Sequence, residues 1–197
     1  MAFVRRLALV VVLLALGACG GGGDAPGAGP PITSGLPGPG AATTRRPEVT
    51  APSPLGTRSE PVPVGAEVAF ENGWTVKVLG TTPDGTAAVL AENQFNDPPA
   101  AGTQFYLVNV SAAYDGADSA SPLGGLSFNA LDRGNTQIRE GRCGVVPDPF
   151  DSFTEVFAGG SLTGNLCFAV SSERVDSLVM YVDAGLIDRQ RAFFALT

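Results

Sequence analysis

Three cysteines carry the reactive chemistry of this chain, and no histidine accompanies them. They stand at positions 19, 143 and 167 of 197 residues. Without histidine, the sequence excludes Ser-His-Asp and Cys-His mechanisms and every histidine-ligated metal site. Three scattered thiols do not supply the ligands of a zinc site, so we expect neither a metal nor a cofactor. Lipid attachment and disulfide formation are the chemistry left to the cysteines.

The first cysteine follows a typical export signal. Two arginines precede the apolar run 7–16, which is too short to span a bilayer. The ending Leu16-Gly17-Ala18-Cys19 resembles the bacterial lipobox, in which a diacylglyceryl group is attached to the cysteine and the chain is cleaved before it. The resemblance implies a signal peptide at 1–18 and attachment of Cys19 to the outer face of the cell membrane. The alternatives are ordinary secretion with a free Cys19 and an uncleaved anchor.

The other two cysteines are predicted to form a disulfide, because an exported chain folds in an oxidising compartment. Cys143 and Cys167 would close a loop across the sheet. Alternation places Cys167 on the face opposite its apolar neighbours Leu166 and Phe168. If those neighbours are core, the disulfide lies on the outer face of the sheet and pins the 143–158 loop. Two reduced buried thiols, or half of a metal site, are the alternative.

Two loops carry polar side chains that suit a binding site. The first is a turn whose side chains can bond to their own backbone, and its candidate binding residues are Asn93, Phe95, Asn96 and Asp97. A purely loop-fixing role is the alternative. The second offers oxygen ligands for calcium, although their spacing matches no EF-hand, from Asp148, Asp151 and Glu155. The alternative there is a solvated acidic loop.

Catalysis by paired carboxylates is not expected. Glycosidases of that kind need a larger scaffold and several aromatic platforms, whereas this chain has one Trp and three Tyr. Trp74 follows a turn and alternates with valines, which predicts core packing rather than a ligand platform. The sequence therefore predicts a protein that is not an enzyme.

Alternation of apolar and polar residues predicts the strands that would position these residues. Asn72-Gly73 separates two alternating runs and predicts a hairpin with a type I′ turn, after a run that includes Val64 and Val68. Further runs predict strands at 103–114, 126–130, 162–170, 178–182 and 193–196, and only 87–93 looks helical. Seven to nine short strands predict an antiparallel sandwich or barrel. The last one reaches the C-terminus, so we expect Thr197 to be a natural end.

The segment before these strands has a different composition. Ten of the forty residues 20–59 are Gly and eight are Pro, and no aromatic residue lies between Phe3 and Phe70. Such a segment cannot bury enough apolar surface to offset its ordering entropy. We expect 19–59 to be a disordered tether and 60–197 to be the folded domain. A Pro-rich recognition motif is the alternative for the tether.

Scattered motifs of the domain resemble a known family. They are Ala91 to Pro99 followed by the strand Gln104 to Tyr114, and the later segment Ala158 to Val170 followed by Leu178 to Tyr181. They resemble an Ig-like domain of actinobacterial lipoproteins. That domain has no known function and is related to the secreted immunogenic antigen of mycobacteria. The resemblance implies an all-β, immunoglobulin-like antiparallel β-sandwich, export and a surface location, but no activity.

The predicted role follows from these expectations. The formal net charge is −7, and cleavage after residue 18 removes two more positive charges, so we expect no nucleic-acid partner. We expect a lipid-anchored extracytoplasmic module that binds a surface protein or a cell-wall component. The alternative is a carrier that holds a small apolar ligand or lipid between its sheets. The oligomeric state is left open.

Overall fold

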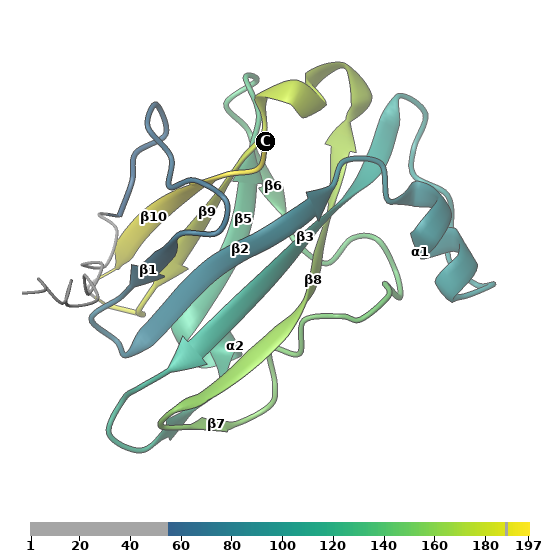
Figure 1. The fold of residues 1–197 in the computed structure, drawn as a ribbon. Coiled ribbons are helices and arrows are strands. Elements are labelled where there is room, and N and C mark those ends of the chain that lie inside the picture. The colour runs from purple at the N-terminus through teal and green to yellow at the C-terminus, as the bar shows by residue number, and fades with distance from the viewer. Residues whose placement is uncertain (1–54, 188) are drawn as a thin grey trace, which may run out of the picture. The chain divides into compact units, whose positions relative to one another are not determined.

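The alternating run at 103–114 forms β3 (Thr103–Tyr114), an inner strand of the first sheet. The computed structural model in Figure 1 describes residues 55–187 and 189–197. The predicted signal peptide, Cys19 and the tether up to residue 54 lie outside the described residues. No helix among the described residues has the length and apolarity needed to cross a membrane.

Two four-stranded antiparallel sheets form the sandwich (Figure 1). The first has the order β1-β2-β3-β8, with β1 (Glu67–Ala69), β2 (Trp74–Thr82) and β8 (Gly160–Ser171) beside β3. The second has the order β10-β9-β5-β6, formed by β10 (Gln190–Ala195), β9 (Val179–Ala184), β5 (Leu126–Leu131) and β6 (Gln137–Arg139). The fold is therefore the expected all-β, immunoglobulin-like antiparallel β-sandwich.

Short elements close the ends of the sandwich. A separate pair of two-residue strands joins β4 (Ser119–Ala120) to β7 (Val156–Phe157). The helices are α1 (Thr86–Glu92), α2 (Pro122–Gly125) and the 3₁₀ helix η1 (Ser172–Ser177). The predicted helix at 87–93 corresponds to α1, whereas the sequence did not indicate the other two.

The main core fills the space between the sheets. Its largest fully buried side chains are Trp74, Tyr106, Phe168, Phe194 and Met180. The predicted core position of Trp74 is thus confirmed, with 1% of its surface exposed. A second, smaller cluster lies on the outer face of the first sheet and consists of Val89, Phe105, Leu107, Cys143, Val146 and Cys167.

The first hairpin forms as predicted, but its turn is of another type. The N–H of Phe70 bonds to the carbonyl of Trp74 at 2.8 Å, and that of Gly73 bonds to the carbonyl of Phe70 at 3.1 Å. Gly73 has φ 86°, whereas Asn72 does not have positive φ, so the predicted type I′ turn is wrong. A single left-handed glycine matches a three-residue hairpin loop. Strand β1 before this turn has only three residues. Val64, which belongs to the alternating run of the sequence, lies before β1 and is 41% exposed.

Residues just before the expected boundary at residue 60 contact the sandwich. The carbonyl of Leu55 accepts a bond of 3.1 Å from the N–H of Phe193, and the Leu55 side chain packs against the main core. Val62 then bridges Phe194 in parallel, so this segment covers the outer edge of β10. The edge of β10 supplies the hydrogen bonds of this segment, and composition alone does not indicate that partner.

Candidate functional site

The disulfide joins β8 to the loop that follows β6. Cys143 and Cys167 are bonded, with their Cα atoms 6.1 Å apart. Cys167 lies on the outer face, while Leu166 and Phe168 lie in the main core, as alternation predicts. Only 1% of Cys167 is exposed, because the second cluster surrounds it. The disulfide thus sits inside a small core of its own.

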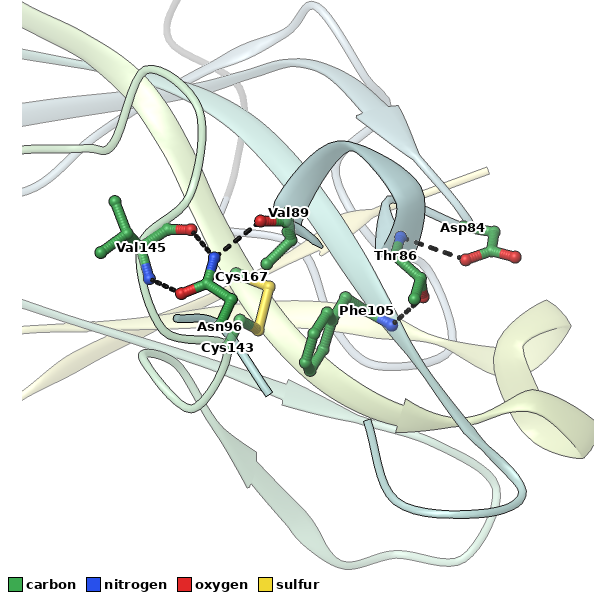
Figure 2. The surroundings of a disulfide bond; sticks show 8 residues. All are labelled: Asp84, Thr86, Val89, Asn96, Phe105, Cys143, Val145 and Cys167. Carbon is green, nitrogen blue, oxygen red and sulfur yellow. Dashed lines mark hydrogen bonds between the residues drawn. A yellow bond between two sulfur atoms is a disulfide. The ribbon is translucent and has the colours of Figure 1, made fainter. Parts of the chain in front are cut away.

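Helix α1 covers one side of this small core (Figure 2). Val89 is the buried residue of the helix. The N–H of Thr86 bonds to Asp84 Oδ1 at 3.2 Å, and Thr86 Oγ1 accepts a bond of 3.1 Å from the N–H of Phe105. The N–H of Gly85 also bonds to the carbonyl of Phe105 at 2.7 Å. These bonds fix the start of the helix to β3.

Asn96 joins the helix to the disulfide loop (Figure 2). Its Nδ2 donates to the carbonyl of Val89 at 2.6 Å and to the carbonyl of Val145 at 2.7 Å. Its Oδ1 accepts from the N–H of Val145 at 2.9 Å. Gly144 has φ 79°, and a Cβ there would lie 2.3 Å from Asn96 Oδ1, so the close approach requires glycine. The Asn96 carboxamide therefore ties the turn to α1 and to the disulfide loop.

The remaining candidates of the turn lie beside this clamp. Asn93 Oδ1 accepts a bond of 3.0 Å from the N–H of Phe95, which makes a local turn. The Phe95 side chain is 82% exposed, and Asp97 is exposed as well. Asn93 and Asn96 thus bond to backbone groups, whereas Phe95 and Asp97 are exposed.

A hollow of about 460 Å³ lies between this turn and the disulfide loop. We call it the disulfide hollow. Its floor is formed by buried or half-buried residues, namely Phe105, Cys143 and Ala169. Its rim includes Phe95, Asp97, Pro98, Pro99 and Arg142. Neither Arg142 nor Asp97 makes an ion pair with another described residue. The hollow thus offers apolar surface together with one unpaired charge of each sign.

The three acidic residues of the segment 148–155 have different surroundings. Asp151 accepts bonds from the N–H groups of Phe153 and Thr154 and from Thr154 Oγ1. The hydroxyl of Thr154 and these backbone donors hold the pKa of Asp151 below its ordinary value. Glu155 accepts a bond of 2.5 Å from Ser119 Oγ. The backbone of Asp148 is in the left-handed region, with φ 44°. Within the described residues, no three His, Cys, Asp or Glu side chains gather as metal ligands.

Sequence reasoning missed two residues of the site. Arg142 precedes Cys143 and lines the hollow beside the disulfide, together with residues that are distant in the sequence. Val145 is 49 positions from Asn96, and it contributes backbone groups whose partner no local pattern indicates. Gly144, which lies between Cys143 and Val145, was the available signal, because glycine permits a close backbone approach.

The chain was compared with family models, curated proteins and solved structures. No family model and no curated protein matches the chain. A secreted protein of Mycobacterium tuberculosis, MPT63, superposes with a TM-score of 0.43 and 16% identity, over 69% of this chain and 98% of that one. The yjhA protein of Bacillus subtilis gives 0.45 and 12%, over 69% and 99%. An uncharacterized β-sandwich protein of Clostridium difficile gives 0.44 and 6%, over 70% and 95%.

Proposed function

We propose that this protein is an exported, lipid-anchored and non-catalytic binding module at the outer face of the cell membrane. Its proposed partner is another surface protein, which inserts an apolar side chain of an exposed segment into the disulfide hollow. The signal-like sequence before Cys19 supports the anchor. The clamped turn supports the binding role, because loops on a rigid scaffold commonly carry recognition.

One observation carries the binding role. Phe95 is 82% exposed, yet the backbone beneath it is held by Asn93, by Asn96 and by the small core of the disulfide. An exposed aromatic side chain on a fixed backbone loses little conformational entropy on binding, and aromatic residues are enriched among the strongest contacts of interfaces. Arg142 and Asp97 on the rim would pair with charges of the bound segment and set its direction.

The carrier of a small apolar ligand remains the second candidate and fits the structure less well. It requires a cavity between the sheets, and Trp74, Tyr106, Phe168 and other large side chains fill that space. The hollow beside the disulfide is on the outer face and has charged groups on its rim. A lipid tail gains nothing from such charges, whereas a peptide segment does.

Photo-cross-linking on intact cells tests the binding role. Lysine-directed reagents are unsuitable, because Lys77 is the only lysine and it pairs with Glu67. A photoreactive amino acid is therefore placed at position 95 and, as a control, at position 153, where Phe153 is 76% exposed. We expect a discrete product from position 95 that mass spectrometry identifies as a surface protein. Equal products from both positions, or a product with cell-wall glycan only, would overturn the proposed partner class.

Partition into detergent tests the anchor. The wild-type chain is expected in the detergent-rich phase, and its processing is expected to be sensitive to globomycin. The Cys19→Ala chain lacks the acceptor thiol and is expected to stay unprocessed. Processing of Cys19→Ala at the wild-type rate, or a wild-type chain found in the aqueous phase, would show that Cys19 is not lipidated.

A further inference from the structure

The end of the sandwich opposite to the disulfide hollow carries exposed aliphatic side chains. Leu186 and Ile187, in the connection between β9 and β10, are 76% and 92% exposed, and Leu123 in α2 is 60% exposed. The N–H of Gly185 bonds to the carbonyl of Gly125 at 3.0 Å, which joins that connection to α2. We call Leu123, Leu186 and Ile187 the apolar tip.

An open hollow of about 530 Å³ lies beside the tip. Leu186 and Ile187 line it together with Trp74, Gly124 and Gly125. Only 1% of Trp74 is exposed, and its Nε1 donates to no other described residue. A Cβ on Gly125 would lie 2.5 Å from Nε1, so this glycine leaves the indole edge uncovered where both residues line the hollow. The hollow thus combines apolar surface with an indole N–H that can reach an acceptor of a partner.

Two exposed carboxylates stand on the turns beside this hollow. Glu71 precedes Asn72, which lines the hollow and whose Nδ2 donates to the carbonyl of Gly125 at 2.9 Å. The N–H of Asp115 bonds to the carbonyl of Gly73 at 2.9 Å, which holds Asp115 against the same turn. Both side chains are exposed, and neither makes an ion pair with another described residue.

Three more exposed carboxylates lie around β4 and α2. Asp118 immediately precedes β4, which contributes to the lining of the hollow. Glu155 accepts a bond of 2.5 Å from Ser119 Oγ in that strand. The carbonyl of the residue after Asp151 accepts a bond of 2.9 Å from the N–H of Leu123 at the tip. None of the three carboxylates has a cationic partner within the described part of the chain.

Two arginines also lie near this end. Arg191 is paired with Asp183, because its Nε and Nη2 donate to the two carboxylate oxygens at 2.6 and 2.9 Å. Arg189 is exposed and lines a neighbouring hollow of about 100 Å³ with Asp183 and Leu186. Among the described residues around the tip, one arginine without an ion pair thus stands against five such carboxylates, and the surface is negative.

We propose that the apolar tip binds a cationic segment of a protein partner. The segment places an apolar side chain in the hollow, against Leu186 and Ile187, and flanks it with lysine or arginine. The carboxylates create a negative potential that attracts such a segment and sets its register. A backbone carbonyl beside the inserted side chain accepts from Trp74 Nε1, which has no acceptor among the described residues. The proposal does not rest on the role proposed for the disulfide hollow.

Other occupants match this surface less well. A second copy of the chain would bring the same carboxylates against each other, and its formal net charge is −7. Anionic lipid headgroups would be repelled by the same carboxylates. A polycation without apolar groups would leave Leu186 and Ile187 in water. A polypeptide segment supplies the apolar side chain, the carbonyl and the cations together.

The tip is remote from the disulfide hollow. Strand β3 begins at Thr103 on the rim of that hollow and ends at Tyr114, which pairs with Trp74 beside the tip. Twelve strand residues span roughly 35–40 Å. In Figure 1, α1 and α2 accordingly lie toward opposite ends of β3. The tip is therefore a separate interaction surface, and its partner need not be the partner of the hollow.

Contact quenching of Trp74, the only tryptophan of the chain, tests the proposal. The exported protein is purified as cells produce it. The probe is a blocked peptide, Lys-Leu-X-Leu-Lys, in which X is 4-iodophenylalanine, because iodine quenches an indole only near contact. A matched peptide has glutamate in place of both lysines. We expect saturable quenching by the lysine peptide, weakened by added salt, and no quenching by the glutamate peptide at the same concentration.

Three variants locate the contact. Asp115→Asn with Asp118→Asn removes two charges of the rim, and Ile187→Ser removes an aliphatic side chain of the tip. Glu92→Gln with Glu173→Gln is the charge control, because these exposed carboxylates lie on α1 and η1 at the other end of β3. We expect the first two variants to lose at least about fivefold in affinity for the lysine peptide, and the control to bind as wild type does.

Three results would overturn the proposal: no saturable quenching of wild type, equal quenching by the glutamate peptide, or wild-type affinity of the Asp115→Asn, Asp118→Asn variant. The comparison of the two peptides uses wild-type protein, so it decides the matter even if a variant fails to fold. Quenching of Trp74 by brominated phosphatidylcholine instead of peptide would assign the tip to lipid. A dimer in sedimentation that Ile187→Ser dissociates would assign it to a second copy. Either result would also overturn the proposal.

Discussion

The side chain of Asn96 pairs with both backbone groups of Val145. It donates to the Val145 carbonyl at 2.7 Å and accepts from the Val145 N–H at 2.9 Å. A third bond reaches the carbonyl of Val89 in the middle of α1. One carboxamide thus joins α1 and its own turn to the loop of Cys143, which is 49 positions away at Val145, and the disulfide lies beside them.

Replacement of Asn96 tests this clamp. Asn96→Ala removes three hydrogen bonds and is expected to lower the free energy of unfolding by about 2 kcal/mol. Asn96→Asp should cost at least as much, because an oxygen would then face two carbonyl oxygens. Urea unfolding measures both, with Gln94→Ala on the exposed neighbour as the control. Equal stability of Asn96→Asp and wild type would contradict the assigned bonds.

The disulfide is expected to contribute about 3 kcal/mol of stability, because it closes a loop whose ends are 24 positions apart. The double variant Cys143→Ala with Cys167→Ala should unfold at correspondingly lower urea concentration. Peptide mapping without reductant is expected to recover the two cysteines in one linked pair. Recovery of both as free thiols from the exported protein would refute the bond.

Two adjacent glycines give a matched test of the packing around Trp74. A Cβ on Gly125 would lie 2.5 Å from Trp74 Nε1, whereas a Cβ on Gly124 would have no neighbour closer than 4.0 Å. Gly125→Ala is therefore expected to cost about 2 kcal/mol through overpacking, and Gly124→Ala to change stability little. Thermal unfolding followed by tryptophan fluorescence compares them. The packing would be misassigned if the two variants were equally stable.

The turn at Asp151 is expected to loosen at low pH. Bonds from Thr154 and from the backbone of Phe153 stabilise the carboxylate and lower its pKa. A lowered pKa in the folded state means that the turn gains its stability above the ordinary pKa of aspartate. It loses that stability as the pH falls through the lowered value. The amide shifts of Phe153 and Thr154 should report this midpoint, and Asp151→Asn should abolish it. A midpoint at or above the ordinary aspartate value would contradict the assignment.

Much of the sandwich could be predicted because its long strands alternate strictly. The run at 103–114 matches β3 at both ends, and the parity of Cys167 against Leu166 places the disulfide on the outer face. Local patterns could not reveal contacts between distant segments. The bond from Leu55 to the edge of β10 and the bonds from Asn96 to Val145 each join segments many residues apart.

The sequence also did not predict the type of the first turn. Asn-Gly suits a type I′ turn, but the register of β1 with β2 leaves a longer loop in which only Gly73 has positive φ. The candidate site was predicted only in part, because some of its residues come together only through the fold. The turn from Asn93 to Asp97 was recognised from its composition, whereas Arg142 enters the site only through the fold.

The central claim is that the chain binds a surface partner through the disulfide hollow. Saturable binding of fluorescently labelled protein to cells that lack their own copy tests it most directly. The account predicts saturable binding for wild type and for Phe153→Ala, and a loss of at least about tenfold in affinity for Phe95→Ala combined with Arg142→Ala. Binding that does not saturate, or that the combined variant retains in full, would contradict the account.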